Sequence, residues 1–178
     1  PRRPTVRRLA ATMGLLGLLG CQTTTPPDPV ASGVGIVAAG CAGLSTDVGS
    51  GMTIERDGQV VTTAHTVGGA TSLTVVDVAG NEFPASIIAF DKDADLALLD
   101  APGLAATPLG IGAANIDDAS AVVWSPDEGV RRVPVRVTKR LSITIEDIYV
   151  EEEVRRSGLE LAGDISVGDS GGAVVDDT

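Results

Sequence analysis

The pentapeptide Gly168-Asp169-Ser170-Gly171-Gly172 places one serine between glycines near the end of the 178-residue sequence. Glycines on both sides allow backbone angles that other residues avoid, and they let a substrate carbonyl approach main-chain N–H groups closely. Such a turn can present Ser170 as a nucleophile and bring the N–H groups of Gly168 and Ser170 together as an oxyanion hole. Gly, Asp and Ser are also ordinary residues of surface turns. The stretch therefore predicts a nucleophile only if the rest of the chain supplies a base.

His65 is the single histidine of the sequence and lies in the β-rich stretch 60–67 (VVTTAHTV), which Gly68-Gly69 closes. A lone histidine is more often a structural residue than a catalyst. A serine nucleophile, however, needs a base that titrates near neutrality, and no other residue of the chain fills that role by default. We therefore predict that His65 is the base.

A carboxylate must then hold the imidazole in the correct tautomer and stabilise the imidazolium. The candidates lie in the stretch 90–100 (FDKDADLALLD). Asp95 stands at the entrance of the apolar run 96–99, where we expect it to be partly buried and within reach of a neighbouring loop. Asp91 and Asp93 lie in a polar turn and Asp100 at the far end of the run, so solvation is expected for all three. Spacing favours Asp95 only modestly and leaves the others open.

The body of the chain is acidic. Residues 1–20 hold four of the 13 basic residues and no acid, so the remainder has 9 basic against 24 acidic side chains, a net charge of −15. This balance argues against nucleic-acid binding. The chemistry of a serine nucleophile needs no metal and no organic cofactor. With few aromatic residues, the core is expected to consist of Val, Ile, Leu and Ala.

Residues 1–21 have the pattern of an export signal. Four arginines precede an apolar run at 9–20, which is too short to span a bilayer as a stable helix. The ending Leu18-Leu19-Gly20-Cys21 is similar to the lipobox of bacterial lipoproteins, which implies lipidation of Cys21. An ordinary signal peptide or an uncleaved anchor is the alternative. In each case we expect the body to be exported to the cell envelope or periplasm, with a lipid anchor in a membrane as the first expectation.

Residues 22–32 (QTTTPPDPVAS) are rich in Thr and Pro and predict a flexible tether. From Gly33 onward, short Val/Ile/Thr-rich runs alternate with turn residues, including hairpin turns at 79–82 and 125–129. Strands this short predict an all-β fold of antiparallel barrels or a sandwich. The expected strands are 35–39, 51–54, 59–63, 72–78, 83–90, 95–99, 119–124, 130–138, 142–150 and 158–162.

The sequence contains His65, Asp95 and Ser170 in this order, within the stretches TTAH, DADLALL and GDSGG. This pattern resembles that of the chymotrypsin-fold (trypsin-like) serine peptidases, in particular the bacterial exported HtrA/Deg and MarP-type branch. The stretch 48–54 (VGSGMTI) resembles the family's strand ahead of the histidine. The resemblance spans about residues 33–176. It implies two packed antiparallel six-stranded β-barrels with the catalytic triad in the cleft between them: residues 33–105 carry His65 and Asp95, and residues 106–178 carry Ser170.

The sequence departs from the family pattern in several ways. The family has further strands after the GDSGG turn, so we expect residues 106–178 to form an incomplete second barrel, with any PDZ domain beyond Thr178. Ala173 stands where the family usually has Pro. In zymogen-activated relatives the counterpart of Asp169 pairs with a freshly cut amino terminus. A lipidated Cys21 would not supply one, so Asp169 is expected to stabilise the turn.

Two further positions carry weaker expectations. Asp164, six residues before Ser170, occupies the position that in trypsin selects basic side chains, but a structural turn explains it equally well. Cys41 is either a small buried hydrophobe or half of a disulfide. By the resemblance to MarP-type proteases its partner lies beyond Thr178, and Cys21 is the lesser option.

The sequence thus predicts an exported serine endopeptidase that acts on protein or peptide substrates through an acyl-enzyme intermediate. The alternative is a non-catalytic surface lipoprotein that uses the same fold as a protein-binding module.

Overall fold

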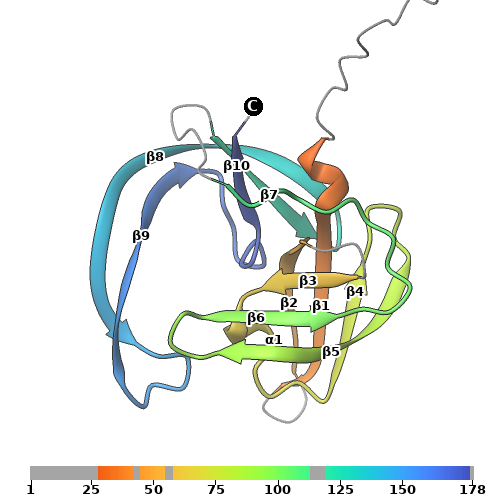
Figure 1. Cartoon of the computed structure of the whole chain (residues 1–178), viewed down its shortest axis with the longest axis horizontal. Coiled ribbons are helices and arrows are strands. Elements are labelled where there is room, and N and C mark those ends of the chain that lie inside the picture. The colour runs from red at the N-terminus through yellow and green to blue at the C-terminus, as the bar shows by residue number, and fades with distance from the viewer. Residues whose placement is uncertain (1–27, 42–44, 55–57, 113–118, 177–178) are drawn as a thin grey trace, which may run out of the picture.

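A computed structural model describes residues 28–41, 45–54, 58–112 and 119–176 (Figure 1). The predicted signal, Cys21 and most of the predicted tether lie outside these residues. No helix within the described ranges is both long and apolar enough to cross a membrane.

The first half of the chain forms a closed, fully antiparallel barrel in the order β1-β2-β3-β6-β5-β4. A 3-10 helix, η1 (Pro29–Ser32), leads into it, and a single helical turn, α1 (Ala64–Val67), separates the third and fourth strands. The six strands are β1 (Gly33–Cys41), β2 (Ser45–Thr53), β3 (Gln59–Thr62), β4 (Ser72–Val76), β5 (Glu82–Asp91) and β6 (Leu96–Asp100).

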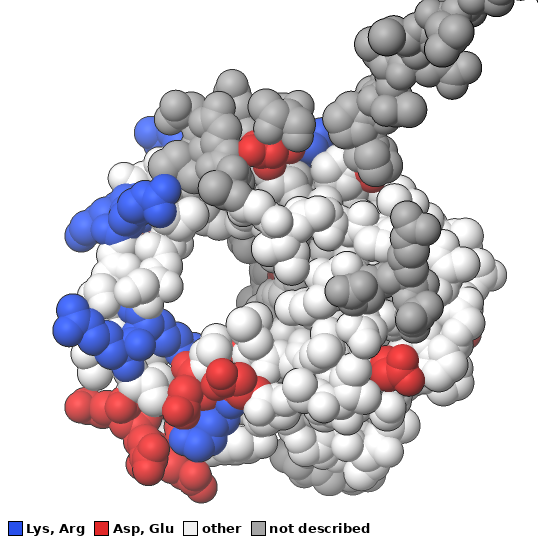
Figure 2. Space-filling model, in the orientation of Figure 1, with Lys and Arg blue, Asp and Glu red and all other residues white. Residues whose placement is uncertain are grey.

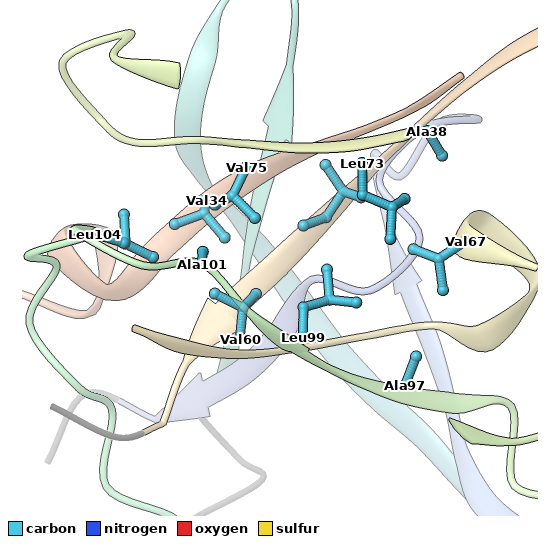
Figure 3. Packing of buried hydrophobic residues seen from close by; sticks show 11 residues of the cluster. Val34, Ala38, Val60, Val67, Leu73, Val75, Ala97, Leu99, Ala101 and Leu104 are labelled. Carbon is cyan, nitrogen blue, oxygen red and sulfur yellow. The ribbon is translucent and has the colours of Figure 1, made fainter. Parts of the chain in front are cut away.

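Aliphatic side chains fill this barrel, as the composition predicts. Val34, Val60, Val75 and Leu99 are fully buried and extend into the same interior from different strands (Figure 3). Successive side chains of a strand point to opposite faces, so every second side chain lies outside the barrel. In β6, for example, Ala97 and Leu99 are buried, whereas Leu96 is exposed and Leu98 and Asp100 are partly exposed. Burial of such side chains stabilises the folded state by about 1.5–3 kcal/mol each.

The second half forms an open antiparallel sheet in the order β10-β7-β8-β9. Its strands are β7 (Ala119–Ser125), β8 (Gly129–Glu146), β9 (Glu153–Gly163) and β10 (Ala173–Asp176). β8 and β9 form a long curved hairpin that arches away from the barrel and returns toward it at the hairpin tip (Figure 1). A wide opening lies between this hairpin and the rest of the molecule (Figure 2).

The predicted all-β class is confirmed, but several strands differ from the prediction. β2 begins at Ser45 rather than at residue 51, and β9 begins at Glu153 rather than at residue 158. The expected strands 130–138 and 142–150 are one continuous strand, β8, with a bulge between Val137 and Lys139. The bulge bends the strand without ending it, so Lys139, Arg140 and Leu141 do not form a turn. The short strand β10 lies directly after the serine motif and is not among the strands expected from the residue pattern.

A tight contact between the barrel and the second sheet sets their relative position. A β-carbon built on Gly35 of β1 would clash with the indole ring of Trp124 in β7. In addition, the hydroxyl of Ser50 accepts a hydrogen bond from the backbone N–H of Trp124 (2.8 Å). Both Ser50 and Trp124 are buried. Glycine at position 35 therefore allows β7 to approach β1 closely.

Candidate active site

His65 and Asp95 are joined by two hydrogen bonds. The imidazole Nδ1 lies 2.8 Å from Asp95 Oδ2, and the backbone N–H of His65 donates to Asp95 Oδ1 (2.9 Å). The backbone N–H of Ala64 donates to the carbonyl oxygen of Asp95 (3.2 Å). Both carboxylate oxygens of Asp95 thus take part in hydrogen bonds with His65, which fixes the orientation of Asp95 against α1. Nδ1 is best protonated opposite a carboxylate, which leaves Nε2 as the basic nitrogen.

Asp95 reaches His65 through an unusual backbone conformation. It has φ +58°, in the left-handed region that non-glycine residues seldom adopt. The preceding turn is stabilised by Asp91, whose Oδ1 accepts the backbone N–H groups of Asp93 (3.0 Å) and Ala94 (2.8 Å). Such strain persists only where the surrounding contacts over-determine the conformation. The contacts to α1 and the Asp91 turn do so here.

The other carboxylates that spacing left open do not contact His65. Asp91 is exposed and caps the turn, and Asp93 is exposed and pairs with Lys92 (2.8 Å). Asp100 ends β6, where it lies in register with Gln59 and Ser86. The structure therefore brings Asp95, of the four, to the histidine; its catalytic role stays a prediction.

Ser170 lies in a tight turn built around Asp169. The carboxylate of Asp169 accepts the backbone N–H of Ser166 (2.9 Å), while its own N–H donates to the carbonyl of Ser166 (3.1 Å). Gly168 and Gly171 have φ values of +99° and +88°, which suit glycine. Within the described residues, the N–H groups of Gly168 and Ser170 donate to no acceptor. They remain available to a ligand oxygen, and their role as an oxyanion hole stays a prediction.

Strand β2 brings the serine turn next to the histidine helix. The N–H of Ser50 donates to the carbonyl oxygen of Ser170 (2.7 Å). A β-carbon built on the adjacent Gly49 would lie 3.1 Å from that same oxygen and 2.8 Å from the Thr66 side chain, next to His65. The stretch 48–54, singled out from the sequence, thus contacts both elements. No hydrogen bond joins the Ser170 hydroxyl to the His65 ring in the part of the chain that the structure describes.

Arg131, on β8, forms an ion pair with Asp169, the residue directly before Ser170. Its Nη2 lies 3.0 and 3.2 Å from the two carboxylate oxygens of Asp169, whose side chain is 2% exposed. Its Nε lies 3.2 Å from the exposed Glu128. Sequence reasoning missed this arginine. The alternation of β8 carried the signal, because Val133 and Val135 are buried and Arg131 shares their face.

A second ion pair links the barrel to the hairpin. The buried carboxylate of Asp147, just after β8, accepts the N–H groups of Tyr149 and Glu151 (3.0 Å each) and lies 2.7 Å from Lys92 Nζ. The hydrogen bond from Glu151, and then that from Lys92, lower the pKa of Asp147 to about 2. Asp147, followed by Asp93, raises the pKa of Lys92. Both groups are therefore charged at neutral pH.

The remaining predicted positions are less defined. Asp164 directly follows β9 and is exposed, so its role in specificity stays a prediction. Cys41 ends β1, and Cys21 lies outside the described residues. Within the described ranges, no three His, Cys, Asp or Glu side chains converge as a metal site.

Comparisons with known proteins identify the family of this chain. The family model described as "trypsin-like peptidase domain" matches residues 49–178. Two curated relatives from Mycobacterium tuberculosis strains, serine protease MT3772 and serine protease Rv3671c, are each 32% identical over 133 residues. The match covers 72% of this chain and 33% of each relative. The chain thus spans about a third of the length of the curated relatives it matches.

Solved structures show the same fold. The active form of the Rv3671c protease from M. tuberculosis superimposes with a TM-score of 0.76 at 28% identity, over 83% of this chain and 66% of that one. The HtrA-type protease AlgW gives 0.66 at 21% identity, over 83% and 48%, a likeness of fold alone. The chymotrypsin-like fold predicted from the sequence is confirmed by these likenesses and by the closed six-stranded barrel.

Proposed function

Because the chain belongs to the trypsin-like peptidase domain family, we propose that it is the proteolytic domain of a serine endopeptidase that hydrolyses peptide bonds through an acyl-enzyme intermediate. The observation that carries this proposal is the contact between His65 Nδ1 and Asp95 Oδ2 at 2.8 Å. It is supported by the attachment of the Ser170 turn to β2, which also contacts the helix of His65.

In the proposed reaction, Ser170 Oγ attacks the scissile carbonyl while His65 Nε2 accepts its proton. His65 then returns that proton to the leaving amine, and an acyl-enzyme remains on Ser170. Water, activated by the same nitrogen, releases the acyl group. Asp95 stays ionised throughout and stabilises the imidazolium. The N–H groups of Gly168 and Ser170 donate to the oxyanion, where one such donor contributes about 2.7–4 kcal/mol.

A fluorophosphonate probe on the full-length protein tests the proposal. The wild type is expected to be labelled at Ser170, while Ser170→Ala and His65→Ala abolish labelling. Ser166→Ala, an exposed serine in the same turn, is the matched control and keeps it. Absence of wild-type labelling, or labelling that survives His65→Ala, contradicts the proposal.

Casein hydrolysis separates the peptidase from the non-catalytic alternative. Loss of the nucleophile typically lowers kcat by about a million-fold. Equal hydrolysis by the wild type and Ser170→Ala would favour a protein-binding module instead.

The proposal extends to export and anchoring through the N-terminal signal pattern and Cys21. In a bacterial host that processes lipoproteins, the full-length protein is expected to incorporate labelled fatty acid and to sediment with membranes. Cys21→Ala removes both properties, whereas Cys41→Ala, the control, keeps them. Unchanged labelling of Cys21→Ala would exclude this anchor.

A further inference from the structure

The tip of the β8–β9 hairpin, residues 147–152, packs against the barrel where the histidine and the aspartate are held. The ring of Tyr149 stacks on Phe90 at the end of β5, with 6.3 Å between centroids. A β-carbon built on Gly68, which ends α1, would lie 3.7 Å from both Ile148 Cδ1 and the Tyr149 hydroxyl oxygen. The tip therefore lies beside Gly68, which follows the helix of His65, and packs on the end of β5, which leads into the loop of Asp95, although it belongs to the other sheet.

Arg156, on β9, extends from this hairpin onto the loop that presents Asp95. Its Nε donates to the carbonyl oxygen of Asp93, and its Nη2 donates to that of Lys92 (3.2 Å). The third nitrogen, Nη1, lies 3.9 Å from Asp95 Oδ2. That oxygen is the one that contacts His65 Nδ1. One guanidinium thus donates to the carbonyl oxygens of Lys92 and Asp93 and lies within ion-pair distance of Asp95.

The geometry of arginine makes these contacts restrictive. A guanidinium is a rigid planar fork, so two nitrogens bound to loop carbonyls determine where the third one lies. The side chains of Arg156 and Asp95 are only 22% and 19% exposed, so solvent screens their attraction less than at an open surface. Asp95 also needs such support, because its φ of +58° is strained.

We propose that Arg156 is a positioning residue of this site. It holds the loop 92–95 from the second sheet, so that Asp95 meets His65 with both carboxylate oxygens, and it places a positive charge beside the carboxylate. Lys92 has a different part: its ion pair with Asp147 docks the hairpin tip on the barrel, but Lys92 is not seen to contact Asp95. The catalytic consequence rests on the proposed peptidase function; the positioning of Asp95 does not.

Proton NMR of the His65 imidazole in the full-length protein tests the positioning directly. A proton held between Nδ1 and a carboxylate gives a downfield signal while it is shielded from water, and His65→Gln identifies that signal by its loss. In Arg156→Met the signal is expected to disappear, because Asp95 is no longer held against the ring. In Lys92→Met, which removes the other cation between the same hairpin and loop, the signal is expected to remain.

Kinetics add a second measurement if the protein is active. Misplacement of a catalytic group by about 1 Å lowers turnover by up to about a hundred-fold. Arg156→Met is therefore expected to lower kcat by about ten- to a hundred-fold with KM nearly unchanged. Arg156→Lys, which keeps the charge without the fork, should fall between this variant and the wild type in both signal and kcat.

Three results would overturn the inference: a wild-type signal in Arg156→Met, an equal loss in Arg156→Met and Lys92→Met, or full function in Arg156→Lys. The equal loss would show that hairpin docking in general supports the pair. If Arg156→Met fails to fold by circular dichroism, Arg156→Lys carries the test. Because the NMR signal needs no hydrolysis, an inactive protein refutes the proposed function without affecting this result.

Discussion

Arg131 donates from a single nitrogen to both carboxylate oxygens of Asp169, the residue directly before Ser170. The serine turn thus receives its counter-cation from β8, within the same chain. By the resemblance to zymogen-activated relatives, the counterpart of Asp169 pairs there with a newly cut amino terminus instead. We therefore expect the Ser170 turn to form without proteolytic activation.

Arg131→Met is expected to destabilise the protein and to abolish probe labelling of Ser170. Removal of one partner of a buried ion pair costs about 3–5 kcal/mol, and the lower end applies because Arg131 is 25% exposed. Urea unfolding and fluorophosphonate labelling measure the two effects. Arg136→Met, an exposed arginine on the same strand, is the control, and equal behaviour of the two variants would contradict this assignment.

The low pKa of Asp147 predicts how the free energy of unfolding changes with pH. Its pKa in the folded state is about 2, below the ordinary value of 3.8. The folded state therefore resists protonation, and the stabilisation by this group is complete above about pH 4 and lost as the pH falls through about 2. Urea midpoints in this range should decline less steeply for Asp147→Asn, which is also less stable at neutral pH. The exposed Asp127→Asn should follow the wild type, and a decline in Asp147→Asn as steep as the wild type's would refute the prediction.

Gly171 should tolerate no β-carbon. It shares a positive φ with Gly80 (+88° and +81°), but a β-carbon on Gly171 would clash with the carbonyl oxygen of Ser50, whereas one on Gly80 meets nothing within 4 Å. Gly80→Ala is expected to cost about 1–2 kcal/mol, the strain of the left-handed conformation alone. Gly171→Ala should cost clearly more and also prevent labelling of Ser170. Similar thermal midpoints for the two variants would count against the packing described for β2.

Gly35→Ala should separate the barrel from β7. Overpacking of a filled interior costs about 1–3 kcal/mol, and the added methyl group would press on the Trp124 ring. Trp124 is the single tryptophan of the sequence and is 6% exposed, so its fluorescence reports on this contact. We expect a red shift of its emission in Gly35→Ala and none in Gly158→Ala, where a β-carbon meets nothing within 4 Å.

Most of the barrel could be predicted from the sequence because its strands alternate and end at turn residues. The turn between β4 and β5 is an example, since Asp77 Oδ1 accepts the N–H groups of Ala79 and Asn81. The sequence predicts two strands where the structure has the single strand β8, because the residue pattern does not reveal the bulge between Val137 and Lys139. His65 is predicted from its residue type, whereas spacing favours Asp95 only modestly and the family resemblance singles it out. The structure places the two side chains in contact, and their catalytic roles stay predictions.

Arg131 and Arg156 were not found, and the reason is physical. Arg131 meets Asp169 across 38 residues, and Arg156 meets the loop at Lys92 and Asp93 across more than 60. These contacts depend on the curvature of the β8–β9 hairpin. That curvature is the accumulated result of small backbone twists at many residues. No local pattern encodes the place at which such a hairpin ends.

The closed barrel and the open sheet differ in how they resist partial unfolding. Every strand of the barrel has a neighbour on both sides, whereas β9 and β10 are the edges of the described second sheet. The barrel also holds the larger buried cluster. Local opening is cheapest where buried apolar contacts are few. In rising denaturant the molecule should therefore lose the Ser170 turn first, while His65 and Asp95 are still folded together.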